Sequence, residues 1–225
     1  MRTKTLALMA ALTAAGALTS TAQVYSVNMV GYINLAIPQG FSLIANQLNN
    51  TPDNKISTLF PAATTANNLV VYKFDNGLGG FSSDQISGGT WSSGGTATLN
   101  PGEGAFVFAP SAFTATFVGE VVTGTSTVTT PLGFSIISSV IPQQGAIYDI
   151  AAPGDGNVDL QYGVPSAQQV FYQFNNGLGG YTSYQFSGSW STEPGPILKV
   201  GESAFVFTSN IGGTHNWTRT FNVGP

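Results

Sequence analysis

The sequence predicts an all-β protein made of two tandem, internally duplicated modules, each a β-sandwich or half-barrel with at most short helical turns. The first observation is a repeat, in which VVYKFDNGLGGFSS at residues 70–83 returns as VFYQFNNGLGGYTS at residues 170–183. The second is an echo, because GEGAFVF at residues 102–108 returns as GESAFVF at residues 201–207. The third is the pattern itself, since aromatic and β-branched residues alternate with polar ones between Gly-rich turns.

The elements of the first copy follow in order. Residues 24–38 have the composition of a half-buried strand pair, and the apolar run at residues 40–45 predicts a buried strand entered from Pro38. Residues 51–61 have a hydroxyl residue, an early proline and spaced apolar positions, which predicts one or two helical turns. Strand 69–74 then precedes Asn76-Gly77, a strong hairpin signal.

The second copy repeats most of this order. Its apolar run lies at residues 133–138, its hairpin signal at Asn176-Gly177, and an insertion rich in Gly and Asp occupies residues 151–164. Trp91 and Trp190 follow the hairpins at equal spacing, which predicts equivalent core positions. Each copy closes with an apolar strand and then a Thr-rich strand, at residues 114–117 and 218–221.

The predicted domain boundaries are 1–22 for a signal peptide, 23–117 for the first module and 118–225 for the second. The strand at residues 114–121 is expected to be shared at the boundary, because VGEV at 118–121 resembles VGYI at 30–33. No flexible linker separates the copies, and only the Thr-rich residues 123–130 offer slack. We therefore expect the modules to dock against each other and cover exposed strand edges.

The N-terminus has the features of a secretory signal peptide. Arg2 and Lys4 precede an apolar run at residues 6–18, and the small residues before Gln23 favour cleavage after Ala22. The protein is therefore expected to be secreted, periplasmic or on the cell surface. We expect no transmembrane segment in the mature chain, and the absence of cysteine excludes disulfides and a cysteine-linked lipid anchor.

The charge balance argues against nucleic acid as a partner. After cleavage the chain keeps four basic residues against ten carboxylates, a net charge of −6. Only 7% of the residues are charged, so Ser, Thr, Asn and Gln must provide most of the polar surface. Such a surface is typical of an extracellular β protein.

The repeated motifs resemble a module of uncharacterised secreted bacterial proteins. In that module a strand of the G-W-N-L-I type is followed, about a domain later, by P-G-x-G-Y-W-[IV]. Here Phe41 and Phe134 stand at the frequent Trp position, and Ala105-Phe106 and Ala204-Phe205 replace the Tyr-Trp pair. The resemblance covers almost the whole mature chain, rests on packing residues, and implies an extracellular or surface β module without implying any catalytic residue.

The insertion contains a candidate calcium site. Asp155, Asn157 and Asp159 place oxygen ligands at alternate loop positions, with Asp149 nearby, as at the start of a calcium-binding loop. The pattern then departs, because Leu160 replaces the expected glycine and Ser166 the closing glutamate. The alternative is that these side chains hydrogen-bond within turns.

Three aromatic residues near turns and edges are candidates for binding a glycan: Tyr181, Tyr184 and Trp217. Aromatic faces stack on sugar rings, and exposed aromatic patches mark binding sites. The alternative is core packing, which fully explains Trp91 and Trp190. The Asn-Gly-Leu-Gly-Gly loops lack the spacing and the following helix of a phosphate loop and are expected to be plain hairpin turns.

Catalytic chemistry has little support in the sequence. Glu103 and Glu202 occupy equivalent turns, where a carboxylate more often accepts backbone N–H groups than acts as half of an acid–base pair. His215 has no partner residues in a recognisable motif. We expect a non-catalytic secreted protein with a structural or adhesive role, without a cofactor, whose partner is an extracellular glycan or a surface protein. The alternatives are a carbohydrate-binding module and a carboxylate-based glycoside-active enzyme.

Overall fold

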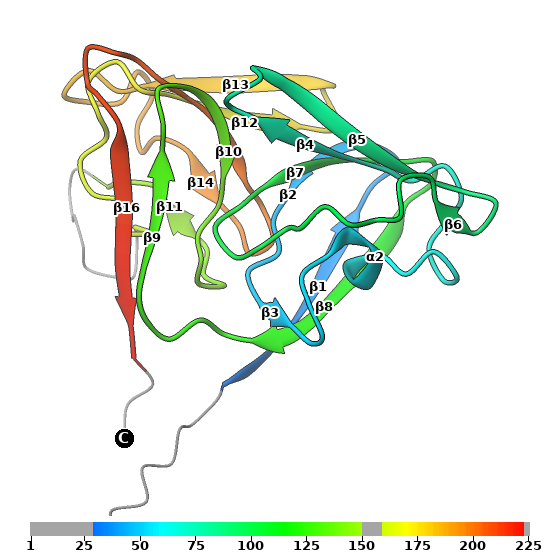
Figure 1. Cartoon of the computed structure of the whole chain (residues 1–225). Coiled ribbons are helices and arrows are strands. Elements are labelled where there is room, and N and C mark those ends of the chain that lie inside the picture. Colours follow the sequence, from blue (N-terminus) through cyan, green and yellow to red (C-terminus); the bar gives the residue numbers. More distant parts are fainter. Residues whose placement is uncertain (1–28, 150–158, 223–225) are drawn as a thin grey trace, which may run out of the picture.

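The structure is a computed structural model that describes residues 29–149 and 159–222. Within these residues it is almost entirely antiparallel β-structure, and the helical content is the single turn α2 (Ile56–Leu59). Figure 1 shows two groups of sheets side by side, with the two ends of the described chain emerging on the same side. The predicted all-β fold with duplicated modules is confirmed.

The first module has two layers. One is a five-stranded sheet in the order β2-β7-β4-β5-β6, formed by β2 (Gly40–Ile44), β4 (Val70–Asp75), β5 (Gly80–Ser87), β6 (Thr90–Trp91) and β7 (Ala105–Ala109). The other is a three-stranded sheet in the order β1-β8-β3, formed by β1 (Val30–Ile37), β3 (Asn49–Asn50) and β8 (Phe113–Glu120). The core lies between the two sheets and includes α2 residues Ile56 and Leu59.

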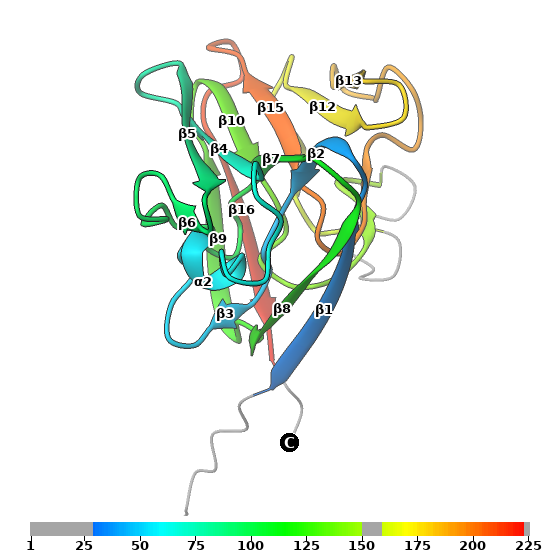
Figure 2. The same cartoon turned by 90° about the vertical axis from the view of Figure 1, so that its right-hand side faces the viewer.

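The second module has the same two-layer arrangement, with four strands in its main sheet instead of five. Its main sheet has the order β10-β15-β12-β13, formed by β10 (Gly133–Ile137), β12 (Val170–Asn175), β13 (Gly180–Gln185) and β15 (Ala204–Thr208). The facing layer consists of β9 (Gly124–Thr130) paired with β16 (His215–Phe221), and of β11 (Gly145–Ala146) paired with β14 (Ile197–Leu198). Figure 2, turned by 90°, shows β1 with β8 and β9 with β16 running toward the chain ends.

The strand registers of the two modules match. Val70 lies opposite Gln85 in the first module, and Val170 lies opposite Gln185 in the second. The pairing of β4 with β7 is likewise repeated by β12 with β15. The repeat seen in the sequence is therefore a repeat of topology and of pairing.

At the junction between the modules each strand belongs to one module only: β8 to the first and β9 to the second. β8 pairs with β1 and β3, so residues 118–120 belong to the facing layer of the first module. The strand that takes the place of β1 in the second module is β9, which pairs with β16.

The closing strands also align differently from the sequence comparison. Phe113 lies opposite Ile37, and His215 lies opposite Thr130. Because Ile37 and Thr130 are equivalent positions, each directly before a proline, these pairings make Phe117 equivalent to Arg219. The Thr-x-Thr-Phe pattern in the sequence instead matches Phe117 with Phe221, two positions further on. A shift of two residues preserves which face each side chain points to, so the alternation pattern could not detect it.

The two turn asparagines join the modules reciprocally. Each side-chain amide donates two hydrogen bonds to backbone carbonyls at the start of the first core strand in the other module. The distances are 2.9 and 2.7 Å from Asn76 to Leu132 O and Phe134 O, and 3.0 and 2.6 Å from Asn176 to Gln39 O and Phe41 O.

A glycine makes this approach possible on each side. Gly40 and Gly133 have φ angles of 94° and 84°, and a Cβ on them would lie 3.3 and 3.5 Å from the asparagine Nδ2 of the other module. A side chain at either position would therefore be strained, and at Gly40 its Cβ would also crowd the amide.

Backbone contacts between the modules are reciprocal as well. Isolated bridges join Ile44 to Glu202 and Ile137 to Glu103. Beside them, Ala45 N donates to Gly201 O at 2.8 Å and Ser138 N donates to Gly102 O at 2.9 Å. Pairs of this kind are the signature of an isologous interface, so the modules form the single-chain equivalent of a two-fold dimer.

None of the described residues forms a helix long and apolar enough to cross a membrane. The chain has no cysteine, so packing and hydrogen bonding stabilise the fold without disulfides.

Candidate functional site

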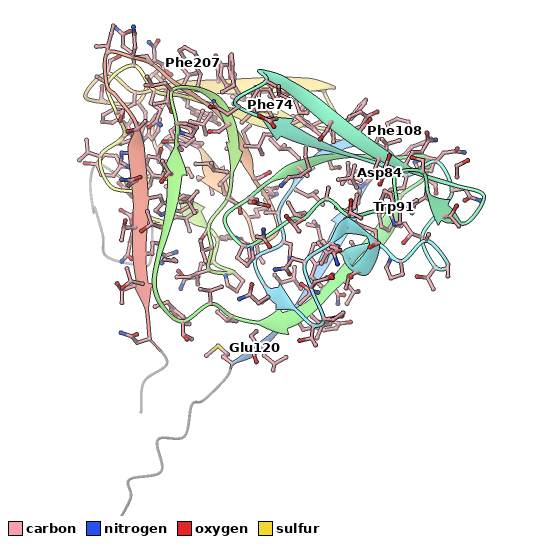
Figure 3. All side chains as sticks on the ribbon, viewed as in Figure 1. Phe74, Asp84, Trp91, Phe108, Glu120 and Phe207 are labelled. Atoms are coloured by element: carbon pink, nitrogen blue, oxygen red, sulfur yellow. The ribbon has the colours of Figure 1, made fainter. Side chains whose placement is uncertain are left out.

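The most distinctive surface of the molecule is an aromatic face formed by both main sheets. In each main sheet alternate residues point to the core, and the others point to the opposite side, called here the outer face. We define the aromatic face as the aromatic residues of the two outer faces: Phe41, Tyr72, Phe74, Phe81, Phe106, Phe108, Phe134, Tyr172, Phe174, Tyr181, Phe205 and Phe207. Figure 3 shows Phe74, Phe108 and Phe207 at the upper side of the molecule, with Asp84 and Trp91 lower down.

Much of this face is open to solvent. The exposed fractions are 43% for Phe41, 49% for Phe81, 38% for Phe134 and 49% for Tyr181. Large exposed apolar patches on soluble proteins mark interaction sites, because leaving them in water is unfavourable. The other outer-face positions are Leu43, Val70, Ser83, Gln85, Ser87, Thr90, Ile136, Val170, Ser183 and Gln185, so the whole outer face is uncharged.

The centre of the aromatic face holds the modules together. Phe106 contacts Phe174 with ring centroids 5.3 Å apart, and the equivalent pair of Phe74 and Phe205 is 5.1 Å apart, both edge to face. Such pairs contribute about 0.5–1.5 kcal/mol each beyond the area they bury. These central rings therefore have a structural role.

The two ends of the face carry the same triad of rings. In the first module Phe41 lies 6.0 Å from Tyr72 and 5.1 Å from Phe108, with interplanar angles of 46° and 57°. In the second module the corresponding distances from Phe134 are 6.3 and 5.0 Å, with angles of 46° and 52°, to Tyr172 and Phe207. The triads lie outside the central pairs and repeat each other closely.

The two ends differ in how their rings pack. A groove of about 330 Å³ lies between the modules, and its lining residues are Phe41, Tyr72, Phe81, Phe106, Phe174 and Tyr181. There Phe41 meets Phe106 edge to face at 86° and 6.4 Å. At the other end Phe134 stacks flat on Phe205 at 9° and 5.0 Å.

The predicted glycan residues do not share one surface. Tyr181 belongs to the aromatic face, whereas Tyr184, three residues along the same strand, points to the opposite side and packs at the edge of the second core. Trp217 is 2% exposed, and its indole N–H donates to Leu160 O at 3.0 Å. The expectation that it lies near an edge is not met, because β16 places it in the core.

The equivalent tryptophans Trp91 and Trp190 are core residues, as predicted. Both are buried, and their indole N–H groups donate to the carbonyls of Phe60 and Tyr148 at 3.1 and 2.9 Å. Each indole therefore ties its strand to the connecting segment of its own module that contains Phe60 or Tyr148.

Of the candidate calcium ligands, Asp155 and Asn157 lie outside the described residues. Asp159 is buried, and its Oδ1 accepts the Gln161 N–H at 2.7 Å. Its charge also raises the pKa of buried Arg219, against the larger effect of burial, which lowers it. Among the described residues no cluster of three or more His, Cys, Asp or Glu side chains is placed to hold a metal ion.

The two turn glutamates have local partners. Glu103 accepts the Asn100 N–H and the Lys73 ammonium, both at 2.9 Å. Glu202 accepts the Lys199 N–H at 3.0 Å and lines a cleft of about 580 Å³ between the modules, together with Tyr184, Gln173 and Thr182. In both modules the carboxylate closes the turn by accepting a backbone N–H, as expected of a glutamate in a turn that contains glycine.

His215 lies at the start of β16 and is half buried. Its ring stacks on Tyr162 with centroids 4.2 Å apart, and its Nε2 lies 2.8 Å from Tyr162 O. Burial lowers the pKa of His215, and the hydrogen bond to the carbonyl partly opposes this. Burial also raises the pKa of the Tyr162 hydroxyl. Tyr162 is therefore a core residue of the second module, and His215 packs against it at the edge of that core.

Sequence reasoning missed the role of Asp84. This buried carboxylate accepts the N–H groups of Gln85, Ser93 and Gly95 and the Ser92 hydroxyl, at 2.8 to 2.9 Å. Burial raises its pKa, but the four donors outweigh burial and hold the pKa below its ordinary value. Tyr184 takes its place in the second module, so no repeated motif pointed to it.

The aromatic face itself was recorded in the sequence as alternating aromatic residues. What sequence reasoning could not decide was which side of each strand faces the core. Both sides of β7 are apolar, and in β4 the side turned to the core is the less apolar one, with Val71, Lys73 and Asp75.

No protein-family model matches the chain, and neither a curated protein nor a solved structure shows significant similarity to it.

Proposed function

We propose that this is a non-catalytic secreted protein with a structural or adhesive role at the cell envelope or outside the cell, and that the aromatic face is its adhesive surface. The carrying observation is that four aromatic side chains of one uncharged outer face, Phe41, Phe81, Phe134 and Tyr181, are 38–49% exposed. The signal-peptide pattern at residues 1–22 supports an extracytoplasmic location. The low content of charge supports a contact made by apolar surface and neutral hydrogen bonding rather than by ion pairing.

The first experiment tests location. The full chain carrying a C-terminal tag is expressed in a secreting bacterial host, and cytoplasmic, envelope and culture fractions are compared by immunoblotting. Mass spectrometry of the recovered protein is expected to show Gln23 as the N-terminal residue. Retention of the intact N-terminus in the cytoplasm would contradict the proposal.

The second experiment tests the surface. Binding of purified residues 23–225 to bacterial envelope fragments is measured by sedimentation for the wild type, for the double variant Phe41→Ser/Phe134→Ser, and for Tyr32→Ser. Tyr32 is the matched control, because it is a 65% exposed aromatic residue on β1, away from the aromatic face. We expect the double variant to lose binding and the control to keep it; equal binding by all three proteins would refute the assignment of this face.

A further inference from the structure

The two copies of the outer face are more alike than the two copies of the core face. In the strands common to both modules there are ten matched outer-face positions, and eight carry the same residue in both copies. The two exceptions are Leu43 with Ile136 and Phe81 with Tyr181. Of the twelve matched core-face positions only six are identical, and two of these are glycines.

This order is the reverse of what packing alone produces. Buried positions are felt by every neighbour, and partly exposed positions tolerate change more readily. Three of the six core-face differences lie at positions that are buried in the first module: Val71 with Phe171, Asp84 with Tyr184 and Ala109 with Thr208. The other three, at Lys73, Asp75 and Ser82, lie at partly or fully exposed positions. The central ring pairs between the modules account for identity at Phe74 and Phe106 only.

The remaining identical positions lie around the triads. They are Phe41, Val70, Tyr72, Ser83, Gln85 and Phe108, matched in the second module by Phe134, Val170, Tyr172, Ser183, Gln185 and Phe207. Tyr72 lies directly opposite Ser83 across the strand pair, and Val70 lies opposite Gln85, with the same pairing in the second copy. Each end therefore presents three rings with a hydroxyl and an amide at their edge.

The chemistry of these ends defines one kind of partner. The outer face is uncharged, so an ionic ligand would lose its hydration without gaining an opposite charge. The rings offer apolar faces for stacking, and Tyr, Ser and Gln supply both hydrogen-bond donors and acceptors. A neutral sugar has the complementary pair of properties, an apolar C–H face and a rim of hydroxyl groups.

We propose that the protein binds neutral polysaccharide through two equivalent sites, one at each triad, and that a single polymer chain engages both. The proposal rests on the adhesive role proposed above and names its partner. A repeating polymer is the partner that gives a reason for keeping two copies of one site, because simultaneous binding makes the second contact intramolecular. The groove beside Phe41 makes the first site the stronger of the two.

The test is native gel electrophoresis of residues 23–225 through gels that contain hydroxyethylcellulose, galactomannan or dextran, with alginate as the charged comparison. We expect retardation by at least one neutral polymer and none by alginate. Phe41→Ala and Phe134→Ala are each expected to weaken binding by about 10²-fold through loss of avidity, with the larger effect for Phe41→Ala. The double variant is expected to migrate as it does without polymer, and Tyr32→Ala as the wild type.

A second pair of variants guards against loss of folding. Gln85→Ala and Gln185→Ala alter partly or fully exposed side chains at the rim. Both are expected to weaken binding with little change in the unfolding midpoint in urea, since the bond lost at Gln85, from its Nε2 to Asn68 Oδ1 at 3.2 Å, is exposed to water. Binding that is unaffected in the double phenylalanine variant would overturn the proposal. So would retardation by alginate alone.

The other occupant to test is a second copy of this chain. Sedimentation velocity on the same proteins distinguishes it: a wild-type dimer that the phenylalanine variants dissociate, without retardation by any polymer, would overturn the polysaccharide proposal. If envelope fragments still bind the wild type in that case, the adhesive role stands and only the sugar partner fails. If neither polymer nor envelope binds, both proposals fail.

Discussion

The reciprocal asparagine contacts allow a sharp test of how the modules are held together. Asn76→Ala and Asn176→Ala each remove two side-chain-to-backbone hydrogen bonds across the interface, at 2.9 and 2.7 Å and at 3.0 and 2.6 Å. A neutral hydrogen bond contributes about 0.5–1.5 kcal/mol net, and here the freed carbonyls regain contact with water. We therefore expect each variant to lower the free energy of unfolding by about 1–2 kcal/mol.

The two-fold arrangement adds stricter expectations. The two single variants should be destabilised equally, and the double variant by the sum, about 2–4 kcal/mol, because the two contacts share no partner. Asn76→Asp should cost more than Asn76→Ala, since a carboxylate would face two carbonyl oxygens without a donor. Asn210→Ala, at an exposed turn position, is the matched control and should change stability by less than about 0.5 kcal/mol.

The assay is equilibrium unfolding of residues 23–225 in urea, followed by tryptophan fluorescence and circular dichroism. Both probes must give the same midpoint for the free energies to be valid. If the two alanine variants behave like Asn210→Ala, the amides do not hold the modules together. If one variant is strongly destabilised and the other is not, the reciprocity of the interface is wrong.

Three further predictions concern individual side chains. Asp84→Asn should lower the free energy of unfolding by about 2–3 kcal/mol at neutral pH, because four donors lose an anionic acceptor. The pKa of Asp84 is depressed in the folded state, so this contribution is present above the unfolded pKa near 3.9 and is lost as the pH falls through the folded pKa. Urea unfolding at pH 7 and below pH 4 should therefore show the stabilities of wild type and variant converging on acidification, and a pH-independent difference would contradict the assignment. Trp217→Ala should cost about 3–5 kcal/mol in the same assay through a core cavity, while a change within about 0.5 kcal/mol would place the indole at the surface. Glu103→Gln should lower the free energy of unfolding by about 1–2 kcal/mol, because it weakens the bonds to the Asn100 N–H and to Lys73 Nζ, which lies 2.9 Å away. The matched change Glu202→Gln should lower it by less, because Lys199 Nζ lies 3.9 Å from the Glu202 carboxylate. The reverse order would refute this interpretation of the two turns.

Local patterns in the sequence were sufficient for the strands. The alternation in Val70–Asp75 and the Asn-Gly signal predicted a hairpin that the structure contains, and the equal spacing of Trp91 and Trp190 placed both indoles at equivalent core positions. Such features depend on neighbouring residues, whose geometry is fixed by backbone sterics and by the period of a strand.

Patterns that involve distant residues were beyond this reach. Trp217 followed a turn-rich stretch and suggested an edge, yet pairing with β9 carries it into the core. The Thr-x-Thr-Phe pattern made Phe117 equivalent to Phe221, whereas the strand register makes Phe117 equivalent to Arg219. A shift of two residues leaves the alternation unchanged, so the pattern could not reveal it.

The sequence by itself determined that one unit is written twice, that the unit is built of strands, and that each copy contains a hairpin at its Asn-Gly signal. The hairpin loop itself has four residues, 76–79 and 176–179, with the left-handed φ at Gly79 and Gly179. Tertiary structure alone decided that the outer aromatic sides of the two sheets face the same region and that Asn76 and Asn176 reach across to the other module. The physical reason is that alternation defines two faces of a strand without saying which one is buried, and in β4 the more apolar face, with Tyr72 and Phe74, is the one turned away from the core. Only the packing of whole sheets settles that choice.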